Sequence, residues 1–287
     1  MSAAQIPIIE TVRDVGEARK AWFVDVWGVV HNGVAPFEVS VDACSAYRGA
    51  GGFVVLVTNA PRPSQSVVEQ LDRIGVPRTA YDAIVTSGDV TRGLIEAWRA
   101  RKIHHLGPER DAPLFADLGV PFVTSDEAEI VVCTGLHDDE TETPDDYRLL
   151  LDRFLRRRAL MICANPDLKV ERGDKIAYCA GALAAKYEEM GGDTVYAGKP
   201  HGPIYELAMG VVQNARGADV GKSDILAIGD GVLTDIPGAT AFGVDALYVG
   251  SGIHLAPEDW TPAAVSALFD PAGEQGRPIA AMPRLAW

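Results

Sequence analysis

Short apolar runs alternate with amphipathic stretches along most of the 287-residue chain. The apolar runs have the length and composition of buried strands, and the longer stretches carry apolar residues at helical spacing. The expected strands are Trp22–Val26, Phe53–Val57, Ala83–Thr86, Ile103–Leu106, Ile130–Cys133, Leu160–Cys163, Val195–Ala197, Ile225–Ile228 and Leu247–Val249. The expected helices include Ser64–Ile74, Val90–Arg99, Asp145–Arg157, Ala180–Met190 and Ile204–Asn214. Alternation of this kind is typical of parallel sheets covered by helices on both faces, so the pattern predicts an α/β fold.

Polar residues able to do chemistry follow four of the expected strands. They are Asp25, Thr58, Asn59, Lys199, Asp230 and Asp235. Because ligands of open parallel sheets bind at the carboxyl ends of the strands, these side chains are expected at one rim. The segment between Thr58 and Lys199 has an alternating pattern of its own. It is long enough to form an inserted domain over that rim.

The residue types at this rim suit phosphate chemistry. Carboxylates on neighbouring strands favour Mg²⁺, which prefers oxygen ligands and usually shares its site with a phosphate. A carboxylate beside the metal can attack phosphorus, and Lys199 and Thr58 are suitable donors to the transferred group. Taken singly, each residue is more often a cap or turn residue. The hypothesis therefore depends on their joint order and spacing.

Composition and length agree with a globular enzyme. Hydrophobic residues make up 47% and charged residues 23%, and the length favours two domains. The sequence contains no run of about 18 apolar residues and no secretory signal pattern. None of the four cysteines belongs to a C-x-x-C pair, which argues against structural zinc. These features predict a cytoplasmic protein without a membrane partner.

The net charge of -14 argues against a nucleic-acid partner, because such binding draws on clustered Lys and Arg. The one basic cluster, Arg156–Arg158, closes an expected helix, where cations complement the helix dipole. An acidic protein still binds phosphate where a metal and a few local cations outweigh the general field. The net charge is therefore compatible with a phosphate-bearing ligand at this rim.

Four segments resemble, in order, the motifs of the haloacid dehalogenase superfamily. The first is DVWGV, which starts at Asp25 and corresponds to D-x-D-G-[TV]. The second is a strand that ends in Thr58, and the third is the lysine of GKP, Lys199. The fourth is GDGVLTD, which contains Asp230 and matches G-D-x(3,4)-D. The set is specific for this family, and the resemblance runs from about residue 20 to 255.

Further segments resemble subclass IIA, the NagD-like and p-nitrophenylphosphatase-like branch. They are Asn165-Pro166-Asp167, GALAAKYEEMGG and GKPHGPIY. The resemblance implies a Rossmann-like parallel sheet core over residues 1–83 and 187–287. It also implies a large inserted α/β cap domain of type C2 over residues 84–186.

The resemblance also implies a role for each matching residue. Asp25 resembles the nucleophile. The implied ligands of a Mg²⁺ ion are Asp25, the backbone carbonyl of Trp27 and Asp230, with Asp235 holding the metal's waters or positioning Lys199. The implied phosphate- and substrate-binding residues are Thr58, Asn59, Lys199 and, in the cap loop Asn165–Arg172, Asp167.

Trp27 is the departure from the family pattern. Most phosphatases of the family carry at this position an Asp that protonates the leaving group and then activates water. Tryptophan has one N–H donor and is not a usable acid. Because general acid–base catalysis is worth roughly 10² to 10⁴ in rate, alkyl phosphate monoesters are expected to be poor substrates.

Three interpretations follow from Trp27. The protein is a phosphatase whose leaving group needs little help, or takes its proton from substrate, water or His31. Alternatively it cleaves a non-phosphoester bond, carbon–phosphorus or carbon–halogen, although the retained Asp230 and Asp235 speak against the metal-free halogen chemistry. In the third interpretation it is a catalytically impaired binding protein that kept the metal site. Association of copies through the cap is expected by analogy only.

Overall fold

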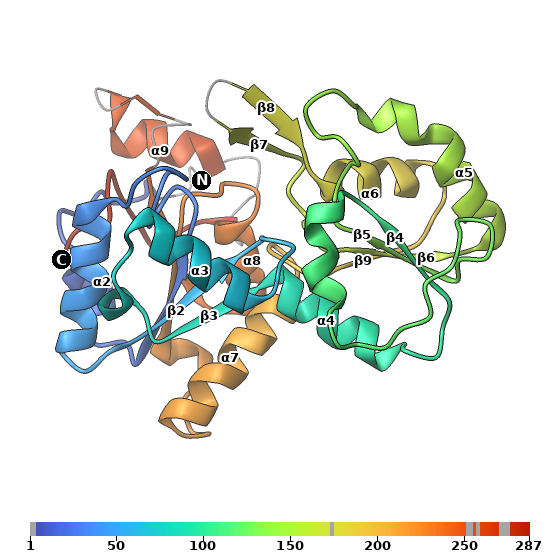
Figure 1. Ribbon diagram of the computed structural model, residues 1–287. Helices are drawn as coiled ribbons and strands as arrows, with labels where there is room; N and C mark the ends of the chain where they lie inside the picture. The colour runs from blue at the N-terminus through green and yellow to red at the C-terminus, as the bar shows by residue number, and fades with distance from the viewer. Residues whose placement is uncertain (1–3, 173–174, 251–254, 257–258, 270–275) are drawn as a thin grey trace. The chain divides into compact units, whose positions relative to one another are not determined.

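The structure is a computed structural model that describes residues 4–172, 175–250, 255–256, 259–269 and 276–287. The chain divides into two compact units (Figure 1). The first unit comprises Met1–Thr58, Val68–Val85 and Tyr205–Trp287, and the second comprises Asn59–Val67 and Thr86–Ile204.

The first unit contains a six-stranded sheet in the order β12-β11-β10-β1-β2-β3. Its strands are β1 (Ala21–Asp25), β2 (Phe53–Thr58), β3 (Ala83–Thr86), β10 (Ile225–Gly229), β11 (Asp245–Val249) and β12 (Ala280–Met282). Strand β1 lies at the centre, and all five of its residues are buried. It pairs in parallel with β10 and β2, so that Asp25 is the register partner of Val57 and Val24 that of Ile228. The carboxyl ends of the three strands therefore lie level.

Helices pack against this sheet. They are α1 (Arg13–Gly16), α2 (Glu38–Gly49), α3 (Ser64–Ile74), α7 (Gly202–Arg216), α8 (Asp235–Phe242) and α9 (Pro262–Phe269), with 3₁₀ turns η1 (Arg78–Ala80) and η4 (Lys222–Asp224). The fully buried Trp22 of β1 stacks on Tyr47 of α2, with ring centroids 3.8 Å apart. The indole N–H of Trp22 donates to the carbonyl of Gly16 at 3.1 Å, so the buried ring has a partner for its polar atom. Among the described residues, no helix combines the length and apolar character needed to cross a membrane.

The second unit contains a four-stranded parallel sheet in the order β4-β5-β6-β9. Its elements are α4 (Ser87–Ala97), β4 (Ile103–Leu106), η2 (Glu109–Phe115), β5 (Ile130–Cys133), η3 (Pro144–Tyr147), α5 (Arg148–Arg157), β6 (Leu160–Cys163), α6 (Ala180–Glu189) and β9 (Thr194–Tyr196). Along β5, Val131 and Cys133 face the cluster that holds α5 and α6, whereas Ile130 and Val132 face Ile95 of α4. Figure 1 shows α6 and α4 on opposite sides of these strands. The period-two alternation buries both faces of the sheet.

The α/β fold predicted from the sequence is confirmed, and the nine expected strands correspond to β1–β6 and β9–β11. The antiparallel hairpin β7 (Lys169–Arg172) and β8 (Lys175–Tyr178) was not expected. Its sequence is rich in charged residues, so it offers no apolar run. Strand β12 and helices α1, α2, α8 and α9 are likewise additions to the expected elements.

The second unit differs in extent from the predicted cap at 84–186. The predicted boundary at 186 lies inside α6. Strand β9 pairs with β6 and completes the four-stranded sheet, so the unit continues to Ile204. It also includes Asn59–Val67, the segment directly after β2.

Candidate active site

Three carboxylates meet at the carboxyl end of the six-stranded sheet. Asp25 is the last residue of β1, Asp230 directly follows β10, and Asp235 begins α8. One carboxylate oxygen of each lies within 4.8 Å of those of the other two. Asp25 and Asp235 are both 8% exposed. Buried carboxylates so close together repel one another unless a cation lies between them, and their hard oxygens suit Mg²⁺.

Glycines allow the backbone to approach these carboxylates closely. The N–H of Gly231 donates to Oδ2 of Asp235 at 3.0 Å. At Gly229 an added Cβ would overlap the carboxyl group of Asp235. At Gly28, where φ is +94°, an added Cβ would lie 2.7 Å from Cγ of Asp230. Main-chain atoms of Gly28 and Gly229 therefore border the cluster and leave no space there for further side chains. A narrow site of this kind suits a small ion.

We expect Gly28→Ala to weaken Mg²⁺ binding by about 10- to 100-fold, the usual cost of disturbing the groups that orient a metal ligand. The new methyl group would push the Asp230 carboxylate away from its place in the cluster. Calorimetric titration of the protein with Mg²⁺ measures the effect directly.

Gly51→Ala is the matched control. Gly51 has nearly the same backbone conformation, with φ of +96°, but an added Cβ would meet no atom within 4 Å. Both variants therefore carry the same left-handed strain, roughly 1–2 kcal/mol, and only Gly28→Ala disturbs a carboxylate. Equal Mg²⁺ affinities in the two variants would contradict a role for Gly28 at the cluster.

Trp27 lies two residues after Asp25, and 41% of it is exposed. Its indole ring rests on Gly33 and meets the ring of His31 edge-on, with centroids 5.4 Å apart. His31 is buried, and this burial lowers its pKa to about 4, so the imidazole is neutral at pH 7. Its Nδ1 accepts a hydrogen bond from the Gly33 N–H at 2.8 Å. His31 therefore packs under Trp27 as a neutral ring.

Within the second unit, Asn59 joins two other predicted site residues. Its Oδ1 accepts from the backbone N–H of Lys199 at 2.7 Å, and its Nδ2 donates to the Lys199 carbonyl at 3.0 Å. The same Nδ2 donates to Oδ1 of Asp167 at 3.0 Å. Asn59 and Lys199 are both buried. The Asn59 amide thus pairs with both the N–H and the carbonyl of Lys199, as the backbone of a neighbouring strand does, and fixes the main chain there.

The structure gathers the predicted residues into two groups. Within the first unit it brings together Asp25, Asp230 and Asp235, with Trp27 beside them and Thr58 closing the adjacent strand β2. Within the second unit it brings together Asn59, Asp167 and Lys199. Sequence reasoning missed Gly28 and Gly229 as walls of the carboxylate cluster. The available signal was a glycine three residues after Asp25 and another directly before Asp230.

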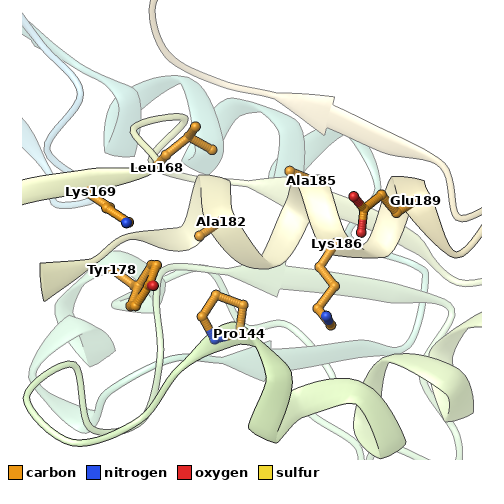
Figure 2. A pocket seen from close by; sticks show the side chains of 8 residues that line it. All are labelled: Pro144, Leu168, Lys169, Tyr178, Ala182, Ala185, Lys186 and Glu189. Carbon is orange, nitrogen blue, oxygen red and sulfur yellow. The ribbon is translucent and has the colours of Figure 1, made fainter.

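A separate pocket lies on the second unit between the β7–β8 hairpin and α6 (Figure 2). Its lining residues are Pro144, Leu168, Lys169, Tyr178, Ala182, Ala185, Lys186 and Glu189. The Lys169 ammonium lies 4.8 Å from the centre of the Tyr178 ring, and Lys186 pairs with Asp145. Leu168 and Lys169 of the predicted cap loop Asn165–Arg172 line this pocket, whereas Asp167 does not, and both cations of the pocket are already engaged.

Two family models match the chain. The model described as haloacid dehalogenase-like hydrolase matches residues 22–121, and a HAD-hydrolase-like model matches residues 196–269. The first match contains Asp25 and Thr58, and the second contains Lys199 and Asp230. The four motifs therefore all fall within matched segments.

Similar proteins include solved structures and characterised enzymes. A hydrolase of the haloacid dehalogenase-like family from Brucella suis 1330 is 47% identical, with 97% of this chain and 100% of that chain covered and a TM-score of 0.85. A 5'-nucleotidase of Bacillus subtilis is 24% identical over 82% of this chain and 88% of its own. The glycerol phosphate phosphatase of Mycobacterium tuberculosis, in complex with calcium, is 26% identical over 83% of this chain and 68% of its own, with a TM-score of 0.64.

Proposed function

Since this chain belongs to the haloacid dehalogenase superfamily, in its subclass IIA, we propose that it is a magnesium-dependent phosphatase in which Asp25 attacks a small phosphorylated metabolite. The expected membership is confirmed by the family models and by the 47% identity to the Brucella suis hydrolase. The chain is a hydrolase that acts on phosphoesters. The observation that carries the proposal is the cluster of Asp25, Asp230 and Asp235 at the carboxyl end of the sheet.

Asp25 supplies the nucleophile in the proposed reaction. One carboxylate oxygen attacks phosphorus, the bond from phosphorus to the ester oxygen breaks, and the leaving group departs with its electron pair. Water then attacks the phosphorus of the aspartyl-phosphate. This step releases inorganic phosphate, restores the Asp25 carboxylate and passes a proton to solvent. Trp27 cannot protonate the leaving group, so that group departs as an anion or takes its proton from water.

The carboxylate cluster and the carbonyl of Trp27 would hold the Mg²⁺ ion. When bound, the metal offsets the repulsion between Asp25 and an anionic substrate. The close glycine walls at positions 28 and 229 support the fit of a small ion. The mycobacterial phosphatase, whose structure is in complex with calcium, supports the binding of a divalent cation by this chain.

The remaining roles follow the resemblance. We assign phosphate binding to Thr58 and Lys199, with Asn59 holding the Lys199 main chain, and substrate contact to Asp167. The second unit takes the part of the cap. Relatives are named as a 5'-nucleotidase, a D-glycerol 3-phosphate phosphatase and an acid sugar phosphatase, and these names denote alkyl phosphate esters. Without an acid at position 27, this chain is expected to differ from them in its class of metabolite. A cytoplasmic location and the association of copies stay predictions.

The proposal is tested by turnover of phenyl phosphate with and without Mg²⁺. A phenolate has a pKa near 10, so it departs with little protonation and the assay needs only nucleophile and metal. We expect turnover with Mg²⁺, loss of turnover in excess chelator and full recovery when Mg²⁺ is restored. Full activity in chelator would mean that phenyl phosphate is hydrolysed without the metal, and it would overturn the proposed dependence on Mg²⁺. Absence of turnover in a protein that binds Mg²⁺ would favour a binding protein on this fold.

A further inference from the structure

The loop after Asp25 carries a partly exposed aromatic side chain, Trp27. The benzene part of the Trp27 indole lies against Gly33, where an added Cβ would come within 2.9 Å of Cζ3. His31 takes up one more side of the ring, at an interplanar angle of 76°. The remaining 41% of Trp27 is exposed. The next residue along the chain, Gly28, packs on the carboxylate of Asp230. Trp27 therefore directly precedes the glycine that contacts the carboxylate cluster.

The loop holds this ring in place through its own hydrogen bonds. The N–H of Gly28 donates to the carbonyl of His31 at 2.9 Å, and the N–H of Gly33 donates to Nδ1 of His31 at 2.8 Å. The side-chain oxygen of Asn32 accepts from the N–H groups of Val34 and Ala35 at 3.0 and 2.9 Å. These hydrogen bonds fix the backbone of the loop, so the partly exposed ring is held in one place two residues after Asp25. Its flat surface suits offset stacking with another planar ring.

The chemistry of the leaving group points the same way. Without an acid at position 27, alkoxide departure is slow, because the conjugate acid of an alkoxide resembles water, with a pKa of about 15.7. A phenolate is the conjugate base of an acid with a pKa of about 10 and leaves far more readily. Trp27 stands where related phosphatases have the acidic Asp, so the same residue removes the acid and adds an aromatic ring. Its presence therefore disfavours alkyl phosphate esters and offers a contact surface to aromatic ones.

We propose that Trp27 is a specificity-determining residue, a stacking platform that selects phosphate monoesters of planar aromatic alcohols. The inference rests on the proposed function, which it narrows to one class of substrate. Trp27 takes no proton in this role; it contacts the ring of the leaving group while Asp25 attacks phosphorus.

The test compares the binding of phenylphosphonate and cyclohexylphosphonate to the full chain with Mg²⁺, by calorimetry. The two ligands carry the same anionic group and rings of similar size, and only the phenyl ring is planar. In the native protein we expect phenylphosphonate to bind about tenfold more tightly, the scale of a strong aromatic pair. In Trp27→Leu the two ligands are expected to bind equally, whereas Trp27→Phe keeps part of the preference.

Val34→Ala is the control, because Val34 belongs to the same loop and is 83% exposed. It is expected to leave the phenyl preference unchanged. Equal binding of both phosphonates by the native protein, a preference that survives Trp27→Leu, or no binding of either ligand would overturn the platform. Because phosphonates are not hydrolysed, the result does not depend on turnover. A phenyl preference in a protein that fails to hydrolyse phenyl phosphate would support the platform and overturn the phosphatase proposal alone.

Discussion

Asp25→Asn is expected to lower the turnover of phenyl phosphate by about 10⁴-fold or more, the scale that loss of a nucleophile reaches in other hydrolases. An amide has the shape of a carboxylate but neither its charge nor its nucleophilic oxygen. The fold should be retained, because Asp25 ends a fully buried strand whose apolar residues and ladder hydrogen bonds are untouched. Removal of one of three crowded negative charges also relieves repulsion in the metal-free protein.

The measurement is kcat with saturating Mg²⁺, alongside circular dichroism and urea unfolding of both proteins. Asp219→Asn is the matched control, because the same change is made in the same unit on a side chain that is 83% exposed. It should leave kcat unchanged. Turnover that survives Asp25→Asn in a folded protein would refute Asp25 as the nucleophile.

Trp27→Asp is expected to raise kcat/KM for an alkyl phosphate such as glycerol phosphate by about 100-fold, within the roughly 10² to 10⁴ range of general acid catalysis. The new carboxyl group would stand where the related phosphatases have their acid. The position tolerates a polar group because Trp27 is 41% exposed. The variant loses the indole contacts with Gly33 and His31, so the loop is expected to be less firmly held.

Trp27→Asn separates the acid from the loss of the ring. Asparagine matches aspartate in size and removes the indole equally, but it has no proton to donate. Parallel measurement of kcat/KM for glycerol phosphate and phenyl phosphate should show a gain only for the alkyl ester and only in Trp27→Asp. The same gain in Trp27→Asn would mean that the bulk of the indole, and not the missing acid, limits the native enzyme.

The sequence alone predicts the α/β class and the strands that carry the site. Strand β1 can be predicted because the run that ends at Asp25 is apolar on both faces, as central parallel strands are. The β7–β8 hairpin was not foreseen, since a short charged hairpin has no apolar periodicity to detect. The end of the second unit at Ile204 was also not foreseen, because membership of β9 in the four-stranded sheet depends on its pairing with β6.

The sequence determined the chemical identity of the site. The order of motif residues after separate strands already indicated phosphate chemistry: Asp25, Thr58, Lys199 and Asp230. Trp27 already showed that the usual acid is missing. Only the tertiary structure decided how these residues are held. Parallel register sets the ends of β1, β2 and β10 level. This brings the carboxylate of Asp25 within 4.8 Å of those of Asp230 and Asp235, which lie in a distant segment of the chain. Three contacts could not be read from the sequence: Gly28 with Asp230, Gly33 with Trp27, and Asn59 with Lys199. Each joins residues that are far apart in the chain or on opposite sides of a loop. Such contacts leave no period in the sequence, because they are set by the space that remains once the sheets have formed.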